Sequence, residues 1–378
     1  MTNQSVPSEK PLVKCKIPSI SNMQQRSILL FDSAIKSDKT RENYACQLRR
    51  FLRHYIIKDF DSLLKIKPKK TQEMIDNYIL YLRSEDKSRS TIKSAIQSLD
   101  LFYSMNDVVL NFKKIKRMIP AEKKHSQSIP YTTEQVKDIL KVLGHDLKWS
   151  AFVHVMCASG MRAGFIEYLK FQDIIDMPNN CKVLRVYSGE KEEYYAFIHH
   201  EAVQSLEKYI QSKKNKNEPT EPNNFVFTKT HDSSKNLSQK DVSVRLSFIL
   251  KKFPEIRGIK ENGRYKVAMS HGFRKRWNTI LKNNKDINPL LAEKMFGHSM
   301  TIPLDTVYHK PSLEILFDEY QKAIPELIID ENERLKLTIQ NQKLELDENT
   351  DKDEKIAKLQ EQLLEVQKHL KELATRSL

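Results

Sequence analysis

The interpretation of this sequence depends on one stretch, Ser270-His271-Gly272-Phe273-Arg274-Lys275-Arg276-Trp277. If the stretch is helical, His271 and Arg274 lie three residues apart and share a face. Together they offer an imidazole donor and a planar guanidinium that binds phosphate through two parallel hydrogen bonds. A His-x-x-Arg pair is common, however, so on its own the stretch also fits an ordinary helix.

Two further segments combine residues of the same kind. In Ser159-Gly160-Met161-Arg162, a turn glycine precedes an arginine where one expected helix ends and another begins, a position that favours an anion. In Phe296-Gly297-His298-Ser299, a Gly-His pair comes shortly before Asp305-Thr306-Val307-Tyr308-His309. A tyrosine hydroxyl, with a pKa of about 10, is a poor nucleophile at neutral pH. It becomes useful where cations stabilise the charge that develops on a phosphorane.

The composition favours a nucleic-acid partner. The chain has 378 residues, enough for two or three domains, and a formal net charge of +15. A basic excess of this size points to a polyanion, although a merely basic soluble protein also fits it. Only 8 glycines occur, and neither GxGxxG nor GxxxxGK[ST] is present, so nucleotide-driven chemistry is not expected.

The cysteines and the apolar runs indicate where the protein works. Four cysteines lie far apart in the sequence, without the spacing of a zinc site or a redox pair. The apolar runs are too short to span a membrane, and the N-terminus lacks the apolar core of a signal peptide. We therefore expect an intracellular, cytoplasmic and nucleoid-associated protein with reduced thiols, no metal and no cofactor.

Changes in proline content, charge and periodicity divide the chain into segments. Apolar residues recur at helical spacing between 22 and 118 and predict about four helices, which begin near residue 23, Thr40, Thr71 and Ser88 or Ser90. We expect a disordered arm at 1–21, this helical domain at 22–118, a linker at 119–131, a second domain at 132–325 and a tail at 326–378.

The second domain is expected to be mainly helical with one small sheet. A capped helix begins at Thr133, and another covers about 149–159. The β-rich runs Val183–Tyr187 and Tyr194–Ile198 flank the turn Gly189-Glu190-Lys191-Glu192-Glu193 and predict a β-hairpin. The fold class is therefore mainly α (α+β), with a small antiparallel sheet.

The tail has the pattern of a coiled coil. Apolar residues alternate at spacings of three and four, at Ile356, Leu359, Leu363, Val366, Leu370 and Leu373. The same register puts Gln342 and Asn349 at core positions, which weakens its middle. Residues 326–378 hold 13 acidic and 9 basic residues, so the basic excess lies in the first 325. We expect the tail to associate with protein rather than with DNA.

The ordered set of arginine, hairpin lysine, His-x-x-Arg, Gly-His and tyrosine resembles the tyrosine recombinase, or phage integrase-type, family, in particular its archaeal members. The resemblance covers about residues 22–325. It implies that 22–118 is a core-binding domain, which closes with the catalytic domain as a clamp around double-stranded DNA.

The resemblance implies an active site of six residues: Arg162, Lys191, His271, Arg274, His298 and Tyr308. The arginines would bind the non-bridging phosphate oxygens, and the two histidines would donate hydrogen bonds. The tyrosine would attack the phosphorus to form a 3′-phosphotyrosyl link, and the lysine would protonate the leaving 5′-oxygen.

The resemblance thus implies a site-specific DNA recombinase or integrase of a mobile element, acting without ATP or metal. Recombination joins two duplexes through four active sites, which implies a homo-tetramer. The tail is a candidate contact between protomers, and a dimerising coiled coil unrelated to catalysis is the alternative for it. The alternatives are a type IB topoisomerase-like enzyme and a non-catalytic DNA-binding protein that retains the fold.

Several residues depart from the family pattern or compete with it. The family usually has glutamate three residues after the first arginine, where this chain has Phe165, followed by Glu167. Lys182 is a poorer alternative to Lys191 as the general acid, and Tyr320 is a fallback nucleophile without the motif spacing. The adjacent His199-His200 is interpreted as a structural pair on a strand, with diverging side chains.

Overall fold

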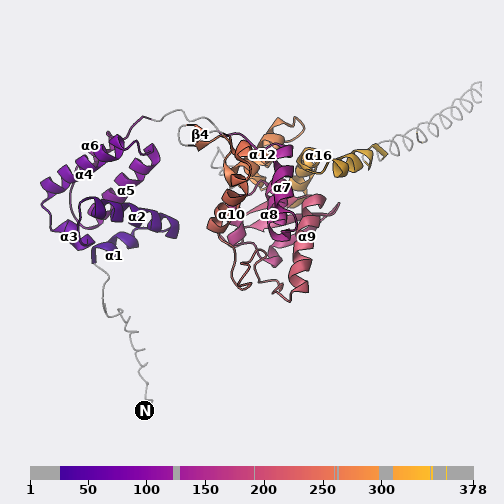
Figure 1. Cartoon of the computed structure of the whole chain (residues 1–378), viewed down its shortest axis with the longest axis horizontal. Coiled ribbons are helices and arrows are strands. Elements are labelled where there is room, and N and C mark those ends of the chain that lie inside the picture. The colour runs from indigo at the N-terminus through magenta and orange to yellow at the C-terminus, as the bar shows by residue number, and fades with distance from the viewer. Residues whose placement is uncertain are drawn as a thin grey trace, which may run out of the picture. The chain divides into compact units, whose positions relative to one another are not determined.

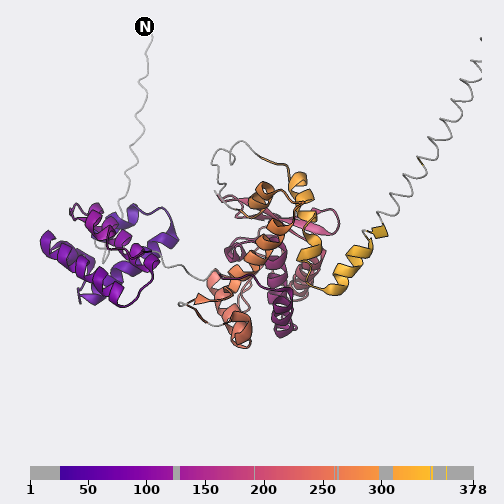
Figure 2. The same cartoon turned by 90° about the horizontal axis from the view of Figure 1, so that it is seen from above.

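The computed structural model describes residues 26–121, 128–190, 192–258, 260–261, 264–297, 310–340, 342–343 and 355. The chain divides into two compact units, Met1–Lys124 and His125–Leu378, which are drawn in Figures 1 and 2. The predicted arm at 1–21 and the apolar seam at 356–373 lie outside the described residues, so both stay predictions.

The first unit is a set of helices around one apolar core. Its longer helices are α1 (Arg26–Ser33), α2 (Asp38–His54), α4 (Pro68–Ser84) and α5 (Arg89–Met105), and its short ones are α3 (Phe60–Leu64) and α6 (Phe112–Lys116). Aromatic side chains from three of these helices, Phe31, Phe51 and Phe102, are fully buried. The four helices expected from the apolar spacing are present.

The predicted helix starts are right at one position and wrong at two. The Ser88 hydroxyl accepts a hydrogen bond from the Thr91 N–H at 3.2 Å and so caps α5. Thr40 lies inside α2, which begins after Ser37. Thr71 lies inside α4, because Pro68 occupies the first helical position, where a missing N–H costs nothing.

The second unit contains the predicted hairpin as part of a three-stranded antiparallel sheet. Its strands are β1 (Ile174–Met177), β2 (Cys181–Val186) and β3 (Tyr194–Ile198), in that spatial order. Val186 pairs with Tyr194 at the turn end of the hairpin. The sequence did not predict β1, which is four residues long and half-exposed or exposed throughout, so no alternating pattern marks it.

Helices surround α8 (Leu147–Ser159), which is buried along most of its length. Figure 1 shows α7 (Thr133–Leu143), α9 (His200–Asn215), α10 (Gln239–Lys251) and α12 (Met269–Asn283) around it. The remaining elements are η1 (Ala163–Glu167), η2 (Phe171–Asp173), α11 (Pro254–Arg257), β4 (Lys260–Glu261), β5 (Arg264–Tyr265), α13 (Pro289–Met295), α15 (Leu313–Gln321) and α16 (Ile324–Leu327). This mainly α fold with a small antiparallel sheet confirms the expected class.

The first residues of the tail are fixed to the second unit. The Glu201 carboxylate at the start of α9 accepts hydrogen bonds from the backbone N–H groups of Ile329 (2.9 Å) and Asp330 (2.8 Å). Residues 331–340 then form a helix, seen beyond α16 in Figure 1. The side chain of Leu337 in this helix packs against the apolar cluster of α13, α15 and α16.

The junction between α8 and α12 depends on a glycine. Gly160 ends α8 in the left-handed conformation, with a φ of +60°. The Trp277 ring of α12 lies so close that a Cβ at Gly160 would be 2.6 Å from its Cγ. The Trp277 Nε1–H donates to the Ala158 carbonyl at 2.9 Å. Only glycine permits both this backbone conformation and this approach.

Gly160→Ala is therefore expected to destabilise the second unit by about 2–4 kcal/mol, through a left-handed alanine and a displaced Trp277 ring. Gly189→Ala is the matched control, because Gly189 also has a positive φ (+81°) but no atom within 4 Å of its absent Cβ. Urea unfolding followed by tryptophan fluorescence measures the effect, since both tryptophans, Trp149 and Trp277, lie in this unit. Equal losses in the two variants would show that the Trp277 contact contributes nothing.

Candidate active site

Arg274 is a buried cation held by backbone carbonyl groups. It lies on α12 and is 5% exposed. Its guanidinium donates to the carbonyls of Gly160 (2.6 Å) and Phe296 (2.7 Å), and it lies 3.4 Å from the centre of the Phe296 ring. Burial lowers the pKa of Arg274 to about 10, so the side chain remains charged at neutral pH.

Arg162 reaches the same turn from a different element. It immediately precedes η1, and its guanidinium donates to the Gly297 carbonyl at 2.9 Å. Phe296 and Gly297, here called the carbonyl turn, follow α13 and thus receive both arginines. The fold brings together two members of the predicted set that are 112 positions apart in the sequence.

His271 lies in the first turn of α12, three residues before Arg274, as the sequence predicts. Burial, followed by the charges of Arg274, Lys275 and Arg162, lowers the pKa of the His271 imidazole. The neutral form, which can accept a proton, is therefore favoured at neutral pH. The Arg274 guanidinium donates a hydrogen bond to the carbonyl of Gly160, which ends α8, so α8 and α12 together position this part of the site.

Among the described residues, neither Arg162 nor Arg274 forms an ion pair with a carboxylate. Phe165, where the resemblance leads one to expect glutamate, is 1% exposed and stacks on Phe152 with ring centres 6.0 Å apart. Glu167 accepts a hydrogen bond from the Gln239 N–H at 2.6 Å, at the start of α10. The departure from the family pattern therefore completes an apolar core and leaves the two arginines without an acidic neighbour at that position.

Sequence reasoning missed two tyrosines near the arginines. Tyr194 begins β3, and its ring centre is 6.2 Å from that of Tyr187, on the turn side of β2. Burial raises the pKa of both phenol groups, that of Tyr187 to about 12, although the charges of Arg162 and Arg274 lower it. In the sequence both residues belong to an ordinary β-rich pattern, so nothing there distinguished them from packing residues.

Three predicted site residues, Lys191, His298 and Tyr308, lie outside the described residues. His298 follows Gly297 directly in the sequence, and Lys191 belongs to the segment that connects β2 to β3. Their roles stay predictions.

The structure gives the two competing residues other tasks. Tyr320 is fully buried, and its hydroxyl donates to the Ala158 carbonyl at 2.9 Å. Burial raises the pKa of Tyr320 well above its ordinary value, which makes it a poor nucleophile. The Lys182 ammonium lies 2.6 Å from a carboxylate oxygen of Asp176 and 3.3 Å from one of Glu207. Both ion pairs occupy the Lys182 ammonium group, so it is a poor candidate for the general acid.

The prediction that His199 and His200 lie on a strand is wrong. β3 ends at Ile198, His199 is the N-cap residue of α9, and His200 is its first residue. His199 is buried, and burial lowers its pKa well below the ordinary value. His200 lies 3.6 Å from a carboxylate oxygen of Glu333 in the tail helix. The prediction fails because α9 follows β3 directly, so the chain leaves the strand conformation at these two residues.

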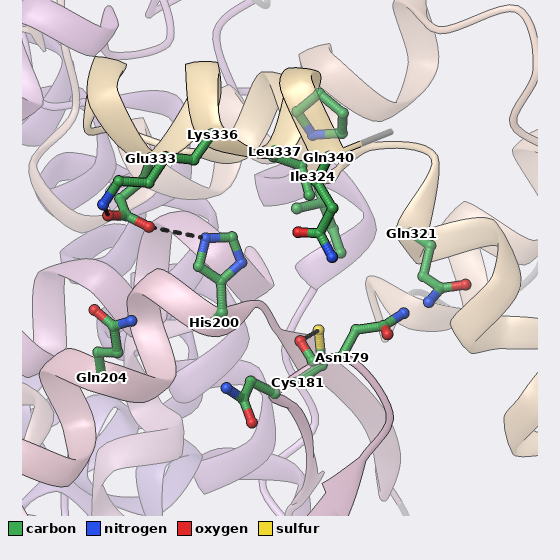
Figure 3. Close-up of a pocket in the computed structure, with 12 residues that line it drawn as sticks. Asn179, Cys181, His200, Gln204, Gln321, Ile324, Glu333, Lys336, Leu337 and Gln340 are labelled. Atoms are coloured by element: carbon green, nitrogen blue, oxygen red, sulfur yellow. Dashed lines mark hydrogen bonds and ion pairs between the residues drawn. The ribbon is translucent and has the colours of Figure 1, made fainter. Parts of the chain in front are cut away.

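A cavity of about 770 Å³ lies beside the tail helix, and neither residue of the carbonyl turn lines it. Figure 3 shows His200 pointing toward the helix that carries Glu333. Asn179 from the β1–β2 turn and Cys181 at the start of β2 lie on the opposite side. Within the described part of the chain, no three histidine, cysteine or acidic side chains gather as metal ligands. No described helix is long and apolar enough to cross a bilayer.

Comparisons with known proteins find similar sequences and similar folds. The model of the Phage integrase family matches residues 131–310. Tyrosine recombinase XerD of Rickettsia bellii (strain RML369-C) is 23% identical over 169 residues, which are 42% of this chain and 55% of that protein. The chain thus matches about half the length of this curated relative.

Two solved structures share the fold at low identity. The Tn1549 transposon integrase in complex with transposon right end DNA has a TM-score of 0.52 at 16% identity, covering 78% of this chain and 98% of that one. A lambda integrase dimer bound to a COC′ core site has a TM-score of 0.50 at 16% identity, covering 77% of this chain and 78% of that one. Residues 131–310 are therefore similar in sequence to the Phage integrase family.

Proposed function

We propose that the protein is a tyrosine site-specific DNA recombinase, which breaks and rejoins DNA strands through a 3′-phosphotyrosyl intermediate. One observation carries the proposal: Arg162 and Arg274 converge on the carbonyl turn. Its Gly297 is the first residue of the Gly-His-Ser segment and lies 11 residues before Tyr308. A buried guanidinium and a half-buried one, with no acidic partner among the described residues, are suited to the non-bridging oxygens of a phosphate.

The chemistry follows from the roles that these residue types can take. Tyr308 attacks the scissile phosphorus, and its proton passes to the neutral His271 imidazole. The bond to the 5′-oxygen breaks, and Lys191 gives that oxygen a proton. Arg162 and Arg274 stabilise the extra negative charge of the phosphorane. The 5′-hydroxyl of a partner strand then attacks the phosphotyrosine, which releases Tyr308. Because the covalent link conserves the phosphodiester energy, ATP is not required.

Duplex DNA is the proposed substrate. The +15 net charge supports this assignment, and so does the similar Tn1549 integrase structure, which is a complex with transposon right end DNA. A recombinase exchanges four strands, so we propose a homo-tetramer at the point of exchange, with the tail as a contact between protomers. Association with the nucleoid would follow from DNA binding, and an archaeal type stays a prediction.

Tyr308→Phe is expected to abolish the covalent adduct while preserving DNA binding, because it removes only the nucleophilic oxygen. The assay mixes protein with nicked DNA drawn from the genome that carries the gene, so that the cleaved fragment diffuses away and religation fails. Adduct is measured on a denaturing gel. Tyr320→Phe is the matched control and keeps the adduct, since its hydroxyl only donates to the Ala158 carbonyl.

The outcomes separate the three classes of activity. DNA binding by the wild-type protein without any adduct would contradict the proposal and favour a non-catalytic DNA-binding protein. Adduct formation with relaxation of supercoils, but without exchange between two duplexes, would instead indicate a type IB topoisomerase-like enzyme.

The pH dependence of cleavage tests the role of His271. Its pKa is lowered, so the neutral imidazole persists as the pH falls, and the rate should decline only below about pH 6.5. The measurement is the adduct-formation rate at limiting DNA, which reports the free protein. His271→Gln should be about 100-fold slower and lack this acid limb. An acid limb centred above pH 6.5, or one that persists in the variant, would contradict the assignment.

A further inference from the structure

We propose that Tyr194 is an additional phosphate-binding residue: its hydroxyl donates a hydrogen bond to a non-bridging oxygen of the scissile phosphate. The inference rests on the proposed function, because it adds a contact to the phosphate that Arg162 and Arg274 would hold. Nothing in the motif pattern singles out this residue, which lies at the start of β3.

Tyr194 lies against the carbonyl turn. Gly297 has a φ of +63°, and a Cβ at that position would be 2.5 Å from Cε1 of the Tyr194 ring. The same Gly297 accepts the hydrogen bond from Arg162, and its neighbour Phe296 accepts the one from Arg274. The tyrosine ring therefore contacts the backbone that orients both guanidinium groups.

The Tyr194 hydroxyl is buried, and its O–H has no acceptor among the described residues. The groups that face its oxygen, the Arg274 guanidinium and the Arg162 backbone N–H, are donors only. The residue is only 9% exposed, so bulk water does not compensate the loss. Buried hydroxyl groups are nearly always paired, because an unpaired one loses its hydration without replacement. An exception inside a cluster of cations suggests that a ligand supplies the partner.

The charges around this hydroxyl identify the chemistry of that ligand. Burial raises the pKa of Tyr194, and the charges of Arg274 and Arg162, which lower it, only partly oppose this rise. The hydroxyl is therefore protonated at neutral pH and available as a donor. A guanidinium has donors only, so it can face the phenol oxygen but cannot accept its O–H. An anion with several acceptor oxygens, such as a phosphodiester, satisfies the hydroxyl and both cations.

The chain offers a matched control for removal of the hydroxyl. Tyr103, on α5 of the other unit, is 1% exposed, and its hydroxyl is also buried without a partner among the described residues. Burial is what raises the pKa of Tyr103, with no contribution from arginine charges. Tyr103→Phe and Tyr194→Phe thus make the same change in different electrostatic surroundings.

The test measures adduct formation in single turnover at saturating DNA, on a nicked duplex that contains the site cleaved by the wild-type protein. Tyr194→Phe should slow this step by about 10- to 100-fold, the range of one hydrogen bond to a charged group. Its melting temperature should not fall, since the change removes an unpaired hydroxyl. Tyr103→Phe should match the wild-type protein in both measurements.

A second measurement distinguishes phosphate contact from a structural role. Phosphorothioate at the scissile position replaces one non-bridging oxygen with sulfur, a weaker acceptor, and the two diastereomers probe the two oxygens. The wild-type rate should fall more than the Tyr194→Phe rate for one diastereomer, because the variant has already lost that contact. This coupling can be read even if the variant is less stable.

Each outcome has one meaning. A wild-type rate in Tyr194→Phe at saturating DNA overturns the inference, and so does an equal sulfur effect in both proteins for both diastereomers. If the wild-type protein forms no adduct at all, the proposed function fails first. If it does form adduct, the proposed function stands and only the role of Tyr194 is decided.

Discussion

The geometry of the candidate site depends on the carbonyl turn at Phe296–Gly297. Its two backbone carbonyls accept hydrogen bonds from Arg274 and Arg162, and the Gly160 carbonyl accepts a further one from Arg274. Backbone acceptors bring no net charge, so they orient the guanidinium groups without neutralising them. A carboxylate in the same place would hold the arginines equally well but would compete with a phosphate for them.

Holding Arg274 in this position costs free energy of desolvation, and the surrounding side chains keep it in place. Arg274 loses most of its contact with water, and its charge is further opposed by that of Arg162, which also lowers its pKa. The Phe296 ring covers one face of the guanidinium, and the Trp277 ring stacks on Phe296 with ring centres 5.4 Å apart. Two like charges held in a poorly solvated site bind a phosphodiester more strongly than they would in water.

The sequence predicted those parts of the site in which chemistry and local structure coincide. The His-x-x-Arg spacing fits α12, and the β-rich runs fit the hairpin, because each signal lies within a single element. It could not predict the carbonyl turn, since backbone groups leave no trace in residue types. It could not predict the role of Tyr194 either, because that role depends on contact between its ring and Gly297, which lies 103 positions later in the sequence. The strand β1 was missed because its exposure does not alternate.

Helix α12 connects the candidate site with the start of the tail. Arg274 faces the carbonyl turn, whereas Arg276 donates to the carbonyls of Glu326 (3.2 Å) and Leu327 (3.3 Å). The Glu201 carboxylate then accepts hydrogen bonds from residues 329 and 330. Burial raises the pKa of Glu201, and these two N–H groups and the Arg276 charge only partly oppose that rise. Cutting the chain at 325, where the tail begins by composition, would therefore leave a cation and a carboxylate without their partners and expose part of the core. The structural boundary of the domain lies after this attachment, so a truncation that tests the coiled coil alone has to keep residues 326–340.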